Sequence, residues 1–254
     1  MAARALHRSA GRAEAGAFLA EGPQAVREAL TRPGTVREIF CTTDSAPRHA
    51  DVVAGHPVTL VDERAMAKLS DTVTPSGLVA VCTTLDVPLT DVLDPTPRLL
   101  AVLVDIRDPG NAGTVLRTAD AAGADAVVFA GTSVDPYNGK VVRASAGSLF
   151  HLPVVRSPDA QQTVAALRTA GVAVLAAAGS GEQDLDDLAG AGGLGGPTAW
   201  LLGNEAHGLP TDIAAAADAR VRVPIHGRAE SLNLAVAAAV LLYASARAHR
   251  TYPD

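Results

Sequence analysis

Three short polar segments in the C-terminal half hold the residue types that could perform chemistry. They are Asn111-Ala-Gly113-Thr-Val-Leu-Arg117, Gly203-Asn204-Glu205-Ala-His207-Gly208 and Ser231-Leu232-Asn233-Leu234. Each follows an apolar run typical of a buried parallel strand, and the first and last are predicted to open a helix. Because ligands gather at the carboxyl ends of the strands in an α/β sheet, the three segments predict one composite site.

The side chains of these segments suit phosphate binding and proton handling. Arg117, early in a predicted helix, carries a fork of donors that suits a phosphate group, and Gly113 would permit close backbone approach. Glu205 lies among glycines at a strand end, which predicts a tight loop with a carboxylate available as acceptor or base. Each position also has a purely structural interpretation: a surface arginine, a glutamate in a turn, and for Ser231 a helix N-cap.

Asn233 would add an amide to the first turn of the last helix, where backbone donors otherwise point at solvent or a ligand. His207 is expected to have no chemical role. Gly139-Lys140 is followed by Val141, so no Walker phosphate loop is formed, and the first segment lacks the Gly-x-Gly-x-x-Gly dinucleotide pattern. A Rossmann-type nucleotide-processing enzyme is therefore the weaker enzymatic alternative.

The elements that must position these segments alternate between strand and helix. The predicted strands are Leu99–Val104, Ala126–Phe129, Leu152–Val155, Val172–Ala177, Ala199–Leu202 and Arg220–Val223. The predicted helices are Gly113–Ala122, Lys140–Ser145, Ala160–Ala170, Asp184–Leu188, Thr211–Ala216 and Ser231–Arg247. Because the strands are apolar throughout, they predict a parallel sheet covered on both faces.

The first half is predicted to be a smaller α/β unit. Its predicted strands are Val36–Cys41, Val58–Val61 and Gly77–Cys82, and its predicted helices are Gln24–Leu30, Asp44–Ala54 and Asp62–Leu69. The stretch 86–97 contains three prolines and little apolar periodicity, which favours a linker. We therefore expect an N-terminal domain over 1–92, a linker over 93–98 and a second domain over 99–254.

Composition limits the class of protein. The 254 residues are 48% hydrophobic with a net charge of −6, which is enough apolar material for a core and argues against a chain that grips nucleic acid along its whole surface. No apolar run approaches the roughly 18 residues that span a bilayer. Cys41 and Cys82 lack metal-ligand spacing, so we expect free thiols, no metal and a cytoplasmic location.

The charge is uneven along the chain. Residues 1–50 carry a balance of +2, which leaves −8 for the remainder, and Arg4, His7, Arg8 and Arg12 form a basic arm. Such an arm is either a solvated, disordered N-terminus or a segment that contacts phosphates.

Taken in order, the three segments resemble motifs 1, 2 and 3 of the SpoU/TrmH family of RNA ribose 2′-O-methyltransferases, in the SPOUT superfamily. The matching residues are Asn111, Gly113, Arg117, Thr118 and Ala119; Gly203, Glu205, Gly208 and Leu209; and Pro224, Gly227, Ser231, Leu232 and Asn233. The likeness covers about residues 99–247, and Arg143-Ala-Ser145-Ala-Gly147 also fits it. Two positions depart from the family pattern: Ala122 stands where an aromatic residue is common, and Ala244 stands where Glu is usual. We interpret both as changes in packing that leave the chemistry intact. Segments 18–22 and 69–77 are similar to the family's ribosomal-protein-like substrate-binding domain.

The resemblance implies a fold, a cofactor and partners. The fold would be a SPOUT α/β-knot, a mostly parallel sheet with a deep trefoil knot, preceded by a smaller ribosomal-protein-like α/β domain. The cofactor would be S-adenosylmethionine, held by Gly203, Ile225 and Leu234, with Ala130 nearby. The partners would be RNA, with ribosomal RNA preferred over transfer RNA, and a second copy of the chain in a homodimer whose interface completes the site.

The implied reaction is in-line methyl transfer to a ribose 2′-oxygen, with Arg117, Asn111, Glu205, Ser231 and Asn233 as the catalytic set. A general-base role for Arg117 conflicts with a pKa above about 12. The alternative is that Arg117 grips the adjacent phosphate while the other four residues shape the pocket. A non-enzymatic alternative is an RNA-binding or ribosome-assembly factor that retains the methyltransferase fold.

Overall fold

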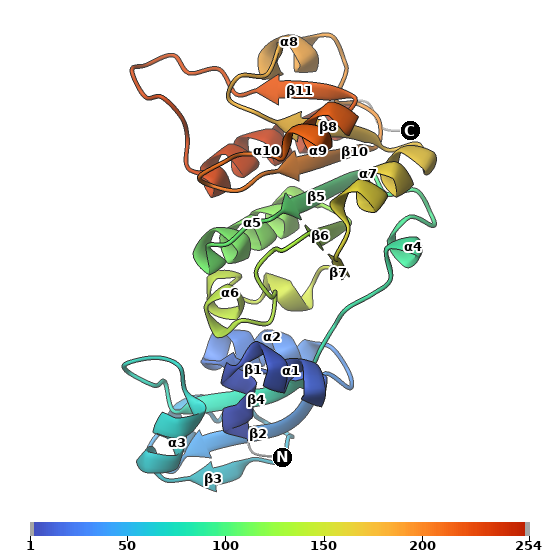
Figure 1. The fold of residues 1–254 in the computed structure, drawn as a ribbon. Helices are drawn as coiled ribbons and strands as arrows, with labels where there is room; N and C mark the ends of the chain where they lie inside the picture. Colours follow the sequence, from blue (N-terminus) through green and yellow to red (C-terminus); the bar gives the residue numbers. More distant parts are fainter. Residues whose placement is uncertain (1–2, 252–254) are drawn as a thin grey trace.

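The computed structural model describes residues 3–251, which form two β-sheets in succession along the chain. In Figure 1 the smaller N-terminal sheet lies at one end, and α6 (Gly139–Ala144) lies between the sheets. The larger sheet and the C-terminal helix occupy the rest of the molecule. This arrangement confirms the α/β class expected from the sequence.

The N-terminal sheet has four strands in the order β1-β4-β2-β3. Its strands are β1 (Ala17–Glu21), β2 (Val36–Thr42), β3 (Thr59–Val61) and β4 (Leu78–Thr83). Its helices and 3-10 turns are η1 (Ala3–His7), α1 (Ser9–Ala15), α2 (Pro23–Thr31), η2 (Ala46–His49) and α3 (Glu63–Leu69). β1 and β2 each run antiparallel to β4, whereas β2 and β3 are parallel.

The sequence patterns missed one strand and overextended one helix in this part. Residues 17–20 are buried on both faces of β1, so no alternation of polar and apolar side chains marks them as a strand. The helix predicted over residues 44–54 is reduced to η2 and turns. There the ring of His49 bonds the carbonyl of Ser76 (3.0 Å), which holds the segment against the loop before β4.

The basic arm is folded over residues 3–15, and Arg12 is not available to a phosphate. Its side chain is buried and pairs with Asp135 of the second sheet region, with Nε 2.8 Å from the carboxylate. Arg12 also donates to the carbonyls of Leu6 (2.9 Å) and His7 (3.1 Å). The phosphate-contacting interpretation therefore fails for Arg12, whereas Arg4 and Arg8 are exposed.

The larger sheet has seven strands in the order β7-β6-β5-β10-β8-β11-β9, and every neighbouring pair is parallel. The strands are β5 (Leu99–Val104), β6 (Ala126–Ala130), β7 (Val154–Ser157), β8 (Ala173–Ala177), β9 (Gln183–Asp184), β10 (Thr198–Leu202) and β11 (Ala219–Arg222). The helices are α4 (Leu89–Val92), α5 (Pro109–Ala122), α6, η3 (Ser148–Phe150), α7 (Ala160–Thr169), α8 (Leu185–Gly190), α9 (Thr211–Ala216) and α10 (Leu234–Thr251). The parallel sheet is confirmed, and the knot stays a prediction.

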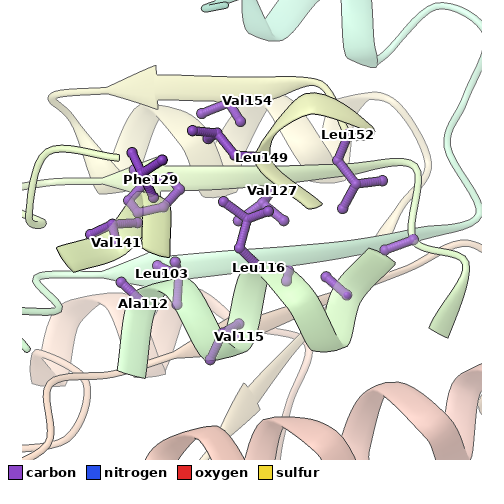
Figure 2. Close-up of a cluster of buried hydrophobic side chains, with 14 of the residues drawn as sticks. Leu103, Ala112, Val115, Leu116, Val127, Phe129, Val141, Leu149, Leu152 and Val154 are labelled. Atoms are coloured by element: carbon purple, nitrogen blue, oxygen red, sulfur yellow. The ribbon is translucent and has the colours of Figure 1, made fainter. Parts of the chain in front are cut away.

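Gly113 allows two helices to pack closely against each other. It is buried, and a Cβ there would lie 2.6 Å from both the Cβ of Ala144 and the carbonyl oxygen of Val141. Figure 2 shows the apolar side chains of α5, among them Leu116, meeting those of β6 such as Val127 in the same core. Only glycine permits this close approach of α5 to α6, so the close backbone approach expected at Gly113 is between these two helices.

The two sheets share one apolar core. Phe18 of β1 stacks near Tyr137 and Phe150 of the second region, with ring centroids 4.7 Å and 6.0 Å apart. The Tyr137 hydroxyl accepts the Leu85 amide (2.6 Å) and donates to Asp86 (3.0 Å), so it also fixes the chain that leaves β4. The N-terminal region is thus packed against the larger sheet region as well as linked to it.

His151 joins the two regions through a pair of carboxylates. Its Nδ1 lies 2.7 Å from Asp120 of α5, and its Nε2 lies 3.2 Å from Glu28 of α2. The hydrogen bond to Asp120, with help from Glu28, raises the pKa of His151 above its ordinary value of 6.5. A raised pKa in the folded state adds stability below pH 6.5 that disappears as the pH rises through the folded-state value.

We therefore predict that raising the pH from mildly acidic to mildly alkaline lowers the free energy of unfolding more in the wild type than in His151→Gln. Urea denaturation of both proteins in the two buffers measures this difference. The effect should be modest, because the His151 ring is 40% exposed and solvent screens the pair. Identical pH dependence in the two proteins would show that the imidazole does not link the regions.

Candidate functional site

The first segment follows β5 and opens α5 four residues earlier than predicted. Asp108 caps the helix, since its carboxylate accepts the Asn111 amide at 2.8 Å, and Pro109 occupies the first helical position. This bond from the Asn111 amide, together with nearby Lys140, lowers the pKa of Asp108. Asn111 therefore lies in the first turn of α5, at the carboxyl edge of the sheet.

The second segment is the tight loop that its glycines predict. Asn204 and Gly208 exchange two backbone hydrogen bonds of 2.9 and 2.8 Å, and Gly208 has a φ of 70°. A Cβ on Gly203 would lie 2.4 Å from the backbone carbon of Gly208, so only glycine fits there. The Asn204 side chain donates to the carbonyl of Asp105 (2.9 Å), which ties this loop to the end of β5.

The third segment precedes α10 rather than forming its first turn. The Asn233 side chain accepts the amides of Ala235 (2.9 Å) and Val236 (3.4 Å), so Asn233 caps the helix. The N-cap interpretation of Ser231 is therefore wrong, because α10 begins only at Leu234, three residues later. Ser231 is exposed.

Hydrogen bonds connect all three segments through their side chains. Glu205 accepts from the amide nitrogen of the Asn111 side chain (3.2 Å) and from the backbone of Asp108 (3.3 Å). The Asn111 side-chain oxygen in turn accepts from the Asn233 side chain (3.2 Å). Residues separated by 94 and 122 positions in the sequence thus form one polar chain, Glu205–Asn111–Asn233, as the composite-site prediction requires.

One side of this polar chain borders a cavity of about 440 Å³, which we call the inner hollow. Its lining includes the four predicted residues Gly203, Ile225, Ser231 and Leu234. Sequence reasoning missed the residues 177–179 that also line it after β8. Their signal resembled that of the other segments, since Gly179 stands two residues after the end of the apolar strand β8.

The other side borders a larger, more open space of about 1010 Å³, which we call the outer hollow. The two hollows share a wall of five residues: Asn111, Asn204, Glu205, Gly208 and Asn233. Arg107, Asp105, Asp108 and His207 are among the other residues that line the outer hollow. The polar chain therefore forms part of the boundary between the two hollows.

Two predicted site residues lie elsewhere in the described protomer. Arg117 is exposed on α5 and lines neither hollow. It stands six positions after Asn111, which places it about 9 Å further along the helix and on another face. Ala130 is fully buried at the end of β6 and also lines neither hollow.

Within residues 3–251, no group of three or more His, Cys, Asp or Glu side chains is placed to hold a metal ion. Over the same range, no helix is both long and apolar enough to cross a bilayer. Cys41 and Cys82 are both free and buried.

Two family models match the chain. The SpoU rRNA methylase family model covers residues 98–243, which include all three segments. The MRM3-like substrate binding domain model covers residues 1–80, which include the four-stranded sheet up to the first part of β4.

Named relatives and solved structures match nearly the whole chain. RlmP of Bacillus subtilis (strain 168), a 23S rRNA (guanosine(2553)-2′-O)-methyltransferase, is 37% identical over 94% of this chain and 92% of its own. An AdoMet-bound rRNA methyltransferase from Sinorhizobium meliloti superposes with a TM-score of 0.83 at 32% identity, covering 97% and 93% of the two chains. The AdoMet complex of AviRb from Streptomyces viridochromogenes gives 0.83 at 29% identity, covering 97% and 95%.

The family model, the full-length relative and the fold agree with the resemblance seen in the three segments. The chain belongs to the SpoU rRNA methylase family, and its larger sheet is the SPOUT methyltransferase fold.

Proposed function

We propose that this protein transfers a methyl group from S-adenosylmethionine to a ribose 2′-oxygen of ribosomal RNA. The polar chain Glu205–Asn111–Asn233 carries the proposal, because it joins the three segments at the boundary between two hollows. The names of the relatives, which include 23S rRNA 2′-O-methyltransferases, support the choice of ribosomal RNA. Transfer RNA, or the 23S rRNA target of a Streptomyces relative, is the second choice.

The inner hollow fits the adenosine part of S-adenosylmethionine. Its volume of about 440 Å³ lies within the usual range for small-molecule pockets. Ile225 and Leu234 supply apolar surface, and Gly203 lines the hollow with backbone alone because it has no side chain. The cofactor supplies a methyl group activated by a sulfonium. Gly203, Ile225 and Leu234 would hold it beside the polar chain.

The acceptor ribose would enter from the outer hollow. Glu205 already accepts two hydrogen bonds from Asn111 and Asp108, and a carboxylate has further lone pairs with which to accept a 2′-hydroxyl proton. Asn111, Ser231 and Asn233 would shape the pocket around that hydroxyl. Arg117 would bind a phosphate, since a guanidinium stays protonated in proteins and is a poor base.

We also propose that the active form is a homodimer whose second copy completes the site. Val236, Val240 and Tyr243 follow one another at helical spacing on α10 and are 51%, 39% and 44% exposed. The Tyr243 hydroxyl reaches the carbonyl of Ala121 (3.4 Å), so this apolar face adjoins α5, which carries Arg117. A second copy on this face would cover the apolar side chains and receive Arg117 near its own hollows.

The N-terminal region, 1–92, would be the RNA-binding domain, with 93–98 as linker and 99–254 as the methyltransferase domain. The family model over residues 1–80 supports this division, and so do the exposed side chains of Arg4 and Arg8. A protein that modifies ribosomal RNA and has two free thiols would work in the cytoplasm.

Leu234→Arg is expected to weaken S-adenosylmethionine binding about 10- to 100-fold, because a charged side chain would replace apolar surface in the inner hollow. Isothermal titration measures the dissociation constant. Leu60→Arg is the matched control, since Leu60 is 58% exposed on β3, far from both hollows. Equal affinity in the wild type and Leu234→Arg would place the cofactor elsewhere.

The function itself is tested by incubating the protein with methyl-labelled S-adenosylmethionine and unmodified 23S rRNA. We expect label in the RNA at a position that resists alkaline cleavage, because a methylated 2′-oxygen cannot attack the neighbouring phosphate. Cofactor binding without transfer to 23S rRNA, transfer RNA or total RNA would favour the catalytically silent RNA-binding factor. Label on a base would contradict the proposed ribose chemistry.

A further inference from the structure

The loop from Asp105 to Asp108, between β5 and α5, is held rigidly on both sides of Arg107. Asp105 has a positive φ of 54°, and its carboxylate accepts the backbone and hydroxyl of Thr132 (2.7 and 2.9 Å). Ile106 is fully buried, and its backbone bonds Ser133 and Val134 (3.1 and 2.7 Å). The backbone of Asp108 donates to Glu205 (3.3 Å). Arg107 therefore projects from a fixed backbone.

The side chain of Arg107 is exposed and lines the outer hollow. Across the part of the chain that the structure describes, it has no hydrogen bond or ion pair. The carboxylates around this hollow are already engaged: Asp105 by Thr132, Asp108 by Asn111 and Lys140, and Glu205 by Asn111. No neighbouring acid thus holds the guanidinium in place.

The charged groups that line the outer hollow are mainly acidic, so a polyanion that enters it depends on the positive charge of Arg107. Three carboxylates, those of Asp105, Asp108 and Glu205, line the hollow, and Arg107 is the one lysine or arginine among its lining residues. A phosphate entering such a hollow needs a cation to offset the carboxylates. The planar guanidinium can bond two phosphate oxygens at once.

We propose that Arg107 binds a backbone phosphate of the RNA next to the acceptor ribose and so holds the RNA at the outer hollow. This inference rests on the proposed function, and it adds a second phosphate contact to the one proposed for Arg117. Arg107 is an RNA-binding residue, because it acts on the RNA backbone and not on the reacting atoms. Arg107 would bind RNA of any sequence equally well, since phosphate groups are the same for every base.

The test compares Arg107→Ala, Arg107→Lys and the wild type in methyl transfer to unmodified 23S rRNA and in filter binding of that RNA at several salt concentrations. We expect Arg107→Ala to raise the KM for RNA about tenfold while kcat changes less than about twofold. The slope of log affinity against log salt should fall by about 0.7–0.9, the loss of one phosphate contact. Arg107→Lys should recover most of the slope and part of the KM.

Arg250→Ala is the charge-matched control, because Arg250 is exposed near the far end of α10 and lines neither hollow. Isothermal titration with S-adenosylmethionine should give wild-type affinity for every variant, which also verifies folding. A wild-type KM and salt slope in Arg107→Ala would overturn the inference while leaving the proposed function intact. Absence of methyl transfer by the wild type would instead remove the proposed function, and this inference with it.

Discussion

Arg117→Ala should reduce methyl transfer to RNA about 100-fold or more while S-adenosylmethionine binds with unchanged affinity. Arg117 lines neither hollow, so its loss should not disturb the cofactor site. Its guanidinium would instead hold the RNA in a reactive position, and a small misplacement of reacting groups costs about this factor in rate. A single-turnover assay beside isothermal titration measures both quantities, with Arg250→Ala as the charge-matched control.

If the protein is a homodimer, a complementation experiment with mixed dimers can show which copy of the chain Arg117 serves. If Arg117 acts in the site of the partner, mixed dimers of Arg117→Ala and Leu234→Arg chains contain one intact site. Random mixing makes about half of the dimers mixed, so activity should recover to about a quarter of the wild-type value. No recovery in the co-expressed mixture would show that Arg117 serves its own protomer, and undiminished turnover in Arg117→Ala would remove this residue from the mechanism.

Gly203→Ala should abolish measurable cofactor binding and destabilise the protein by about 1–3 kcal/mol. The added Cβ would lie 2.4 Å from the backbone of both Gly208 and Leu209, and backbone atoms cannot move aside as a flexible side chain can. The loop would have to open, which breaks the paired bonds between Asn204 and Gly208 and displaces Glu205 from Asn111. Isothermal titration and urea denaturation measure the two effects.

Gly196→Ala is the matched control for this substitution. A Cβ at Gly196 meets no atom within 4 Å, so the same chemical change should leave cofactor affinity at the wild-type value. Near wild-type affinity in Gly203→Ala would mean that the loop over residues 203–208 can shift without consequence, and hence that it does not build the cofactor site.

Local patterns predicted the elements of the larger sheet well, since their signals lie within single segments. The strand Leu99–Val104 and the helix Thr211–Ala216 have the predicted bounds, because the first is a continuous apolar run and the second follows Pro210. The convergence of the three segments was also predictable, since parallel strands bring their carboxyl ends to one edge of a sheet.

Features that depend on contacts between distant residues were not predictable in this way. Arg12 looked like part of a solvated arm until Asp135, over 120 positions away, was seen to pair with it. Close backbone approach at Gly113 was predictable, but its partner Ala144 was not, because Ala144 comes from another element. Ser231 and Asn233 are both good capping residues, and the observed path of the chain selects Asn233.

The position of Arg117 outside both hollows follows from helix geometry and not from a contact with a distant residue. The motif puts Asn111 and Arg117 on one helix, but six positions on an α-helix turn the second side chain away from the first. A single sequence describes one protomer, whereas the proposed role of this arginine requires two. The proposed need for a second copy is supported by an exposed apolar face near Arg117, formed by Val236, Val240 and Tyr243.

The proposed function requires that three segments build a single site for the methyl donor and the acceptor ribose. A crystal structure of the protein with S-adenosylmethionine tests this claim most directly. We predict that the adenosine part occupies the inner hollow between Gly203, Ile225 and Leu234, with the methyl group facing the outer hollow near Glu205. Cofactor bound outside both hollows, with the Glu205–Asn111–Asn233 chain untouched, would contradict it.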